Sequence, residues 1–64
     1  MPKVKTFTTD LAIFKTAKQL EELDRVVNEF IVENQIKMIY SVSDTTSTID
    51  GGATMGLIRV LAFD

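Results

Sequence analysis

The segment from Thr54 to Phe63 constrains the fold most, because it is apolar on both of the faces that a β-strand presents. One face would carry Ile58, Val60 and Ala62. The other would carry Met55, Leu57, Leu61 and Phe63, interrupted only by Arg59. A strand of this kind is normally covered on both faces. The pattern therefore predicts a central strand with a layer on each side.

One helix is available to supply such a layer. Thr16 and Gln19 have the spacing of a capping box, and apolar residues then recur at helical intervals, at Leu20, Leu23, Val27, Phe30 and Ile31. We predict a helix over residues 16–34, which can cover only one face. A chain of 64 residues forms a small core worth about 3–5 kcal/mol. The simplest cover for the second face is another copy of the chain.

Two further segments read as strands. Val4 to Thr8 is rich in β-branched residues. Gln35 to Ser43 alternates, with one apolar side formed by Ile36, Met38, Tyr40 and Val42. Asp10 to Phe14 is either an additional helical turn or an extended segment that covers a sheet edge. We predict one α+β domain over residues 1–64, with β-α-β-β order and a mainly antiparallel sheet of order 1-3-2; a parallel crossover between the first two strands is the alternative.

The composition excludes several kinds of chemistry. The chain has no His and no Cys, so it lacks the residues for a conventional zinc site, a thiol nucleophile or a Ser-His-Asp relay. We expect no enzyme, no metal and no cofactor. A formal charge of −2 argues against nucleic-acid binding, and no apolar run is long enough for a bilayer. The absence of cysteine is typical of a reducing cytoplasm.

The charges predict a binding face. If the helix covers the face with Val4, Met38, Tyr40 and Val60, then the opposite face carries Lys3, Lys5, Lys37 and Arg59, away from the acidic residues of the helix. A basic, partly apolar face suits a flat anion such as a nucleotide, with Phe7, Leu57 or Phe63 against the base. Alternatively the lysines only protect strand edges. Arg59 needs a partner, which is an acid of a neighbouring subunit, a ligand anion or solvent.

The segment from Ser43 to Thr54 is predicted to be a long loop rich in hydroxyl groups and glycine. Such a loop cradles phosphate or sugar oxygens, or it is a plain hairpin connection whose Asp44 and Asp50 are solvated. The candidate ligand-binding residues are therefore Lys5, Phe7, Lys37, Ser43, Thr45, Thr46, Gly51, Gly52 and Arg59.

Three short stretches resemble small sporulation-associated proteins of spore-forming bacteria and their phages. They are Lys3-Val4-Lys5-Thr6-Phe7, then Leu23 with Asn28-Glu29-Phe30-Ile31, then residues 36–43, Ile-Lys-Met-Ile-Tyr-Ser-Val-Ser. The resemblance implies no catalytic residue. In size, in its oligomer-prone build and in its lack of catalytic residues, the chain is also similar to phage proteins that sequester cyclic nucleotides.

A third resemblance is to oxalocrotonate-type tautomerases, which share the length and the β-α-β-β order. That family uses an N-terminal proline amine as its base, a role that would fall to Pro2, with Arg25 or Arg59 binding the substrate carboxylate. Met1 precedes Pro2 and would acylate its nitrogen, which argues against this activity.

We therefore expect a small non-catalytic homo-oligomer that sequesters an anionic small molecule, in particular a cyclic nucleotide signal, as in phage anti-defence. The alternative is a protein-interaction or structural accessory module without a small-molecule ligand.

Overall fold

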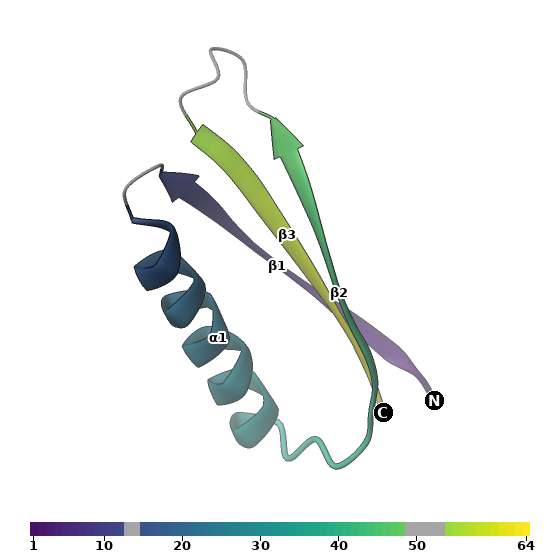
Figure 1. The fold of residues 1–64 in the computed structure, drawn as a ribbon. Helices are drawn as coiled ribbons and strands as arrows, with labels where there is room; N and C mark the ends of the chain where they lie inside the picture. The colour runs from purple at the N-terminus through teal and green to yellow at the C-terminus, as the bar shows by residue number, and fades with distance from the viewer. Residues whose placement is uncertain (13–14, 49–53) are drawn as a thin grey trace.

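The computed structural model describes residues 1–12, 15–48 and 54–64 (Figure 1). Its elements are β1 (Lys3–Ala12), α1 (Thr16–Glu33), β2 (Ile39–Thr48) and β3 (Thr54–Phe63). The strands form one sheet of order β1-β3-β2, and both pairings are antiparallel. The predicted α+β fold with strand order 1-3-2 is therefore confirmed, and the parallel crossover is wrong.

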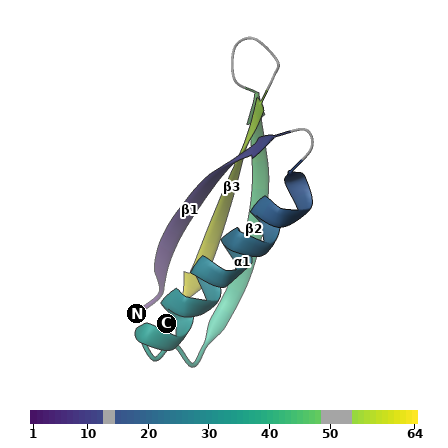
Figure 2. The same ribbon diagram turned by 90° about the vertical axis from the view of Figure 1, so that its left-hand side faces the viewer.

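The helix lies along one face of the sheet, mainly over β1, as Figures 1 and 2 show. We call this the covered face. Its side chains pack with the helix in a core whose buried residues are Phe7, Leu23, Val27, Leu57, Leu61 and Phe63. No helix within the described residues is both long enough and apolar enough to cross a bilayer.

The structure corrects the prediction of which face the helix covers. Val4, Met38 and Tyr40 were expected beneath it, but their exposed fractions are 71%, 54% and 55%. The helix instead covers the face with Phe7 and Leu61. The larger side chains on that face remove more apolar surface from water, and the free energy of burial grows with that surface. Burial of this face places Phe7, Leu57 and Phe63, the expected contacts of a base, inside the core.

Three aromatic rings connect the helix to two strands. The ring of Phe30 in α1 meets the rings of Phe7 in β1 and Phe63 in β3 edge to face, with centroids 5.5 and 5.6 Å apart. This arrangement places the positive edge of one ring against the negative face of the next. It fixes the position of α1 over the junction of β1 and β3.

The start of α1 is bonded to the end of β1. Thr16 and Gln19 were predicted to cap each other, but the structure shows no side-chain cap on this helix. Both bond to Ala12 instead: Thr16 Oγ1 donates to its carbonyl oxygen at 3.0 Å, and its amide donates to Gln19 Oε1 at 2.7 Å. The two residue types do form polar contacts at the helix start, although their partner lies in the strand.

The end of α1 is a Schellman turn without glycine. The amide of Ile36 donates to the carbonyl of Ile31, and the amide of Gln35 donates to that of Val32. Gln35 has a positive φ of 53°, which is the left-handed conformation that glycine adopts at the lowest cost. The helix ends within one residue of its predicted end.

The first two strands differ from their predicted bounds, whereas β3 has the predicted bounds. The segment between β2 and β3 is shorter than the predicted loop. β1 continues to Ala12, so residues 10–12 are extended. Of the two alternatives for this segment, the extended one is therefore confirmed for residues 10–12, and the additional helical turn is wrong there. β2 starts only at Ile39 and continues through residues 44–48, which were predicted to be loop. A register irregularity between Ile39 and Ser41 breaks the expected alternation, so that Ile39 and Val42 both face the helix side.

Candidate functional site

Arg59 occupies the centre of the covered face and joins three elements. Its Nε and Nη2 donate to the two carboxylate oxygens of Asp44 in β2 at 2.8 and 3.0 Å, and its Nη1 donates to Asp24 in α1. The Arg59 side chain is only 14% exposed. A two-pronged pair of this kind satisfies a planar guanidinium in fixed geometry. The pair explains how a charged residue is tolerated beside a small apolar core.

The same contacts determine the ionisation of the pair. The hydrogen bonds from Arg59 lower the pKa of the Asp44 carboxyl below its usual value, against the opposing effect of partial burial. The bonds to Asp44 and then Asp24 raise the pKa of Arg59, which is charged at every accessible pH. Arg59 was expected on the open face, with a neighbouring subunit, a ligand or solvent as its partner. That placement is wrong, because both partners are acids of the same chain.

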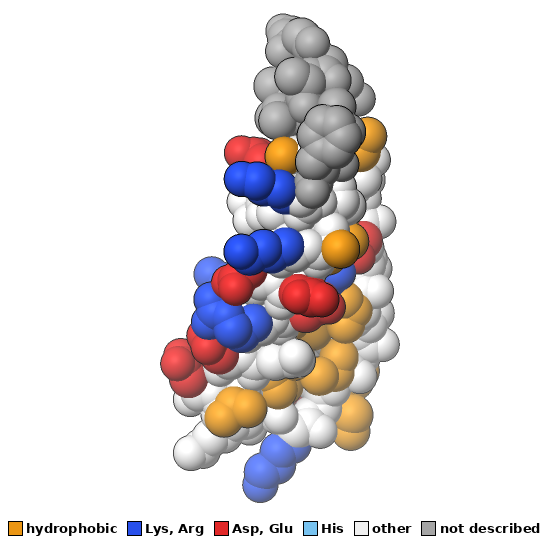
Figure 3. Space-filling view, turned by 60° about the vertical axis from the view of Figure 1, so that its left-hand side comes forward, with side chains coloured by type: hydrophobic (Ala, Val, Ile, Leu, Met, Phe, Trp, Pro, Cys, Tyr) orange, Lys and Arg blue, Asp and Glu red, His pale blue; other side chains and the backbone are white. Residues whose placement is uncertain are grey.

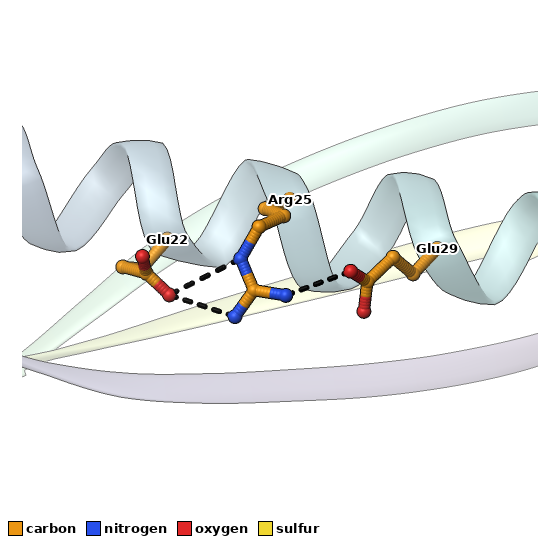
Figure 4. Close-up of polar contacts among 3 residues, drawn as sticks. All are labelled: Glu22, Arg25 and Glu29. Atoms are coloured by element: carbon orange, nitrogen blue, oxygen red, sulfur yellow. Dashed lines mark hydrogen bonds and ion pairs between the residues drawn. The ribbon is translucent and has the colours of Figure 1, made fainter.

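Arg25 provides a contrast on the outer surface of α1. It donates to Glu22 at 2.8 and 3.3 Å and to Glu29 at 2.7 Å (Figure 4). Its side chain is 55% exposed, so these pairs lie in water. The hydrogen bond from Arg25 lowers the pKa of Glu22. Exposed pairs of this spacing support a helix only weakly. They do not position a binding group.

The opposite side of the sheet, which we call the bare face, has no helix over it among the described elements (Figure 2). The register places four rows of side chains on it: Val4–Ala62–Ser41, Thr6–Val60–Ser43, Thr8–Ile58–Thr45 and Asp10–Gly56–Ser47. The central strand supplies aliphatic side chains that are partly buried by their neighbours. Both outer strands supply mainly hydroxyl groups. Among these described positions, Asp10 is the only charged residue.

A groove of about 320 Å³ runs between α1 and β2 on the covered face. Its apolar lining is Val27, Ile31, Ile39 and Val42, and its polar lining is Asp24, Asn28 and Arg59. Figure 3 shows hydrophobic side chains gathered on this side of the molecule, below acidic ones. The groove is open because α1 packs over β1 and its backbone does not approach β2 within the described residues. Ile39 and Val42 are consequently 43% and 54% exposed.

Seven of the nine candidate ligand-binding residues are described, and the structure does not bring these seven together. Arg59 and the buried Phe7 lie on the covered face, and the ammonium of Lys5 is 5.9 Å from the ring centroids of Phe7 and Phe30. Ser43 and Thr45 lie exposed on the bare face. The remaining four are Thr46 on the helix side of β2, Lys37 before β2, and Gly51 and Gly52, which lie outside the described residues. The expected basic, partly apolar open face is therefore wrong as a surface. Ligand binding itself stays a prediction.

Sequence reasoning missed Asp24 and Asp44 as the partners of Arg59. One signal was available, because a mid-strand arginine with large apolar neighbours needs acids within reach. Asp44 lies directly opposite Arg59 in an antiparallel pairing, but this could be seen only with the strand extended past Ser43. Within the described residues, no three acidic side chains group closely enough to hold a metal ion.

No protein-family model, no curated protein and no solved structure matches this chain with significant similarity. The resemblances to sporulation-associated proteins, to nucleotide-sequestering phage proteins and to tautomerases therefore stay predictions.

Proposed function

We propose that this protein is a non-catalytic assembly module, in which copies of the chain stack bare face against bare face. The observation that carries the proposal is the bare face itself, where a row of aliphatic side chains on β3 is flanked by short hydroxyl side chains on β1 and β2. Small, nearly uncharged side chains allow two sheets to approach to the usual separation of about 10 Å.

Charge favours this contact over one between helices. α1 carries five acidic and two basic residues, a formal charge of −3, so two copies of its outer surface repel each other. Among the described positions, the bare face carries a single acid near one end, at Asp10. Two such faces meet with little repulsion and bury Val60 and Ile58 of both copies.

The test is the mass of the particle in solution for the wild type and for Val60→Lys, by native mass spectrometry and sedimentation equilibrium. Val60→Lys places a cation at the middle of the proposed contact, and we expect the particle to fall to half its mass. Val4→Lys is a second variant with the same expected direction. Because Val4 is 71% exposed, its replacement leaves the fold of one chain intact.

Val26→Lys is the matched control, since it makes the same change on the helix at a valine that is 41% exposed. We expect it to leave the particle mass unchanged. A wild-type protein that is monomeric at high micromolar concentration contradicts the proposal, and so does a Val60→Lys protein that is folded and retains the wild-type mass.

Sequestration of an anionic ligand, the function expected from the sequence, is tested separately. A thermal-shift screen against cyclic di- and trinucleotides would show a rise in Tm for a true ligand, since saturation at 100 times Kd adds about 2.7 kcal/mol. The described structure offers hydroxyl groups for such a ligand at Ser43 and Thr45. Arg59, the cation that was expected to bind the anion, is already paired with two acids of the same chain. We therefore expect no shift.

A further inference from the structure

The two edge strands of the sheet differ in how well they are protected. Each pairs with β3 alone among the described residues, so each has one side without a strand partner. β1 carries Lys3, Lys5 and Asp10, and lysine on an edge strand is a common protection against pairing with another chain. β2 contains no lysine, arginine or proline, and its Ile, Tyr, Val and Thr residues are types that favour β-strands.

The single charge on β2 does not protect its edge either. Asp44 is held by Arg59 through two hydrogen bonds, so its charge is balanced within the chain. The irregularity between Ile39 and Ser41 lies at one end of the strand, and the register from Ser41 to Thr48 is regular. A second strand therefore meets neither a repelling charge nor a distorted backbone along most of β2.

Exposed apolar side chains also gather at β2. Nine large hydrophobic residues are exposed among the described ones, and four of them fall within residues 38–42: Met38, Ile39, Tyr40 and Val42. Ile39 and Val42 form the outer wall of the groove beside α1. A strand that pairs with the free edge of β2 would place every second side chain next to Ile39 and Val42. In edge-strand addition the backbone hydrogen bonds provide affinity, and contacts of these alternate side chains provide specificity.

We propose that the occupant of this edge is β2 of a second copy, antiparallel to the first about a two-fold axis. Two copies of a neutral strand are self-complementary, because each supplies both an unpaired backbone edge and an apolar wall. The product is a continuous six-stranded sheet with both helices on one side. Its opposite side is one bare face of twice the width.

The doubled width matters for the area of contact. Three strands of ten residues cover roughly 33 by 14 Å, so one bare face offers only about 450 Å². Stable interfaces bury about 800 Å² on each partner. A six-stranded face offers roughly 900 Å², which reaches that size. The edge pairing does not require the proposed stacking, and each contact is broken by a different substitution.

Thr46 and Thr9 form a matched pair of positions for the test. They lie on opposite sides of Leu57 in the same row, on the same face, one on each edge strand. We expect Thr46→Lys and Thr46→Glu to raise the dissociation constant of the edge-paired dimer at least tenfold, because each copy then carries a charge of the same sign on the edge strand, and a charged edge disfavours pairing with another chain. Thr9→Lys and Thr9→Glu should leave it unchanged. Circular dichroism and Tm establish that all four variants are folded.

Particle masses separate the two contacts. If both hold, the wild type contains four copies, Val60→Lys two, and the double variant one. Thr46→Lys then contains two copies only at high protein concentration and dissociates on dilution, because a three-stranded bare face offers about half of the contact area. If stacking fails and the edge pairing holds, the wild type and Val60→Lys both contain two copies, and Thr46→Lys contains one. A folded Thr46→Lys protein with the wild-type mass and dissociation constant overturns the edge pairing, and so does dissociation caused by the Thr9 variants.

Amide hydrogen exchange gives a second reading without a substitution. In a lone sheet the outward amides of both edge strands have no strand partner. The Ala12 amide of β1 donates to Gln19 and is left out of the comparison. Pairing at β2 slows exchange on that strand alone. We expect β2 to exchange more slowly than β1, and the difference to disappear on dilution or in Thr46→Lys. Equal exchange on both edges at concentrations where the protein is oligomeric overturns the proposal.

Discussion

The covered face and the bare face of β3 come from one ten-residue strand, yet they differ in the size of their side chains, in charge and in whether a helix covers them. The covered face carries the largest side chains together with a charged residue, Arg59, whose partners Asp24 and Asp44 come from two other elements. On this strand the bare face carries Gly56, Ile58, Val60 and Ala62, which are smaller on average, and no helix of the described residues lies over it. The difference shows that apolar area, and not the absence of charge, selected the face on which the helix packs. Arg59 is tolerated there because its partners are within reach.

The largest expected effect tests this selection. Leu61 is fully buried on the covered face, with 0% exposure, and Leu61→Ala removes core contacts and leaves a cavity worth about 2–5 kcal/mol. Since the stability of so small a core is about 3–5 kcal/mol, we expect Leu61→Ala to be mostly unfolded at 25 °C. Val60→Ala on the bare face should cost about 1 kcal/mol in dilute protein. Urea unfolding followed by circular dichroism measures both.

Equal losses of stability for Leu61→Ala and Val60→Ala would contradict the distinction between the faces. Repeating the measurement at higher protein concentration sharpens it. If Val60 lies in an interface between copies, Val60→Ala lowers the free energy of unfolding more strongly as the protein concentration rises. Leu61→Ala lowers it substantially at every concentration, because the lost contacts lie in the core of each chain.

An intermediate effect is expected at the Arg59 cluster. Asp44→Asn removes a partly exposed, two-pronged ion pair and should lower the free energy of unfolding by about 1–2 kcal/mol at pH 7. The pKa of Asp44 is lowered in the folded chain, so its stabilising effect is complete above its unfolded pKa of about 4. The effect is lost as pH falls through the lower, folded pKa. Melting temperatures between pH 2 and 7 measure this dependence.

Asp44→Asn should therefore lose less stability on acidification than the wild type does. Asp10→Asn is the control, because it removes a carboxylate on the bare face, away from Arg59. We expect it to retain the wild-type acid dependence. A wild type and an Asp44→Asn variant with the same loss of Tm below pH 4 would show that the pair does not stabilise the fold.

The smallest expected effect concerns the end of the helix that covers the face. Gln35 has a φ of 53°, so Gln35→Gly relieves a left-handed conformation and should raise the free energy of unfolding by about 0.5–1 kcal/mol. Thermal unfolding measures the gain. Asn34→Gly, one residue earlier, has a φ of −96° and should not stabilise. The particle mass should not change in either variant, because neither face of the sheet is altered.

Local patterns predicted the elements with good accuracy. The helix over residues 16–34 follows from apolar residues at helical spacing, and its observed bounds differ by one residue. The bounds of the first two strands were less accurate, whereas those of β3 were predicted correctly. Residues 44–48 were predicted to be loop because they are rich in Ser and Thr, although Thr is a good strand former and β3 offers them a partner along their whole length. This misassignment concealed the ion pair of Asp44 with Arg59.

The candidate site was predicted poorly for a related reason. Its residues were grouped on the assumption of perfect alternation through β2 and of a helix beneath Val4 and Tyr40. One irregularity at Ile39 changes the face of every later residue in that strand, and sequence alone does not place such irregularities. The exposure of Ser43 and Thr45 on the bare face follows from the observed register.

The amino-acid sequence by itself determined the order of the elements and indicated the central place of β3, because periodicity and turn positions are local properties. It favoured the antiparallel sheet but left a parallel crossover as an alternative. Only the tertiary structure decided which side of β3 the helix covers and which acids neutralise Arg59. Both sides of that strand are apolar, so the choice depends on the summed burial of side chains from separate segments. That sum exists only once the segments are packed together.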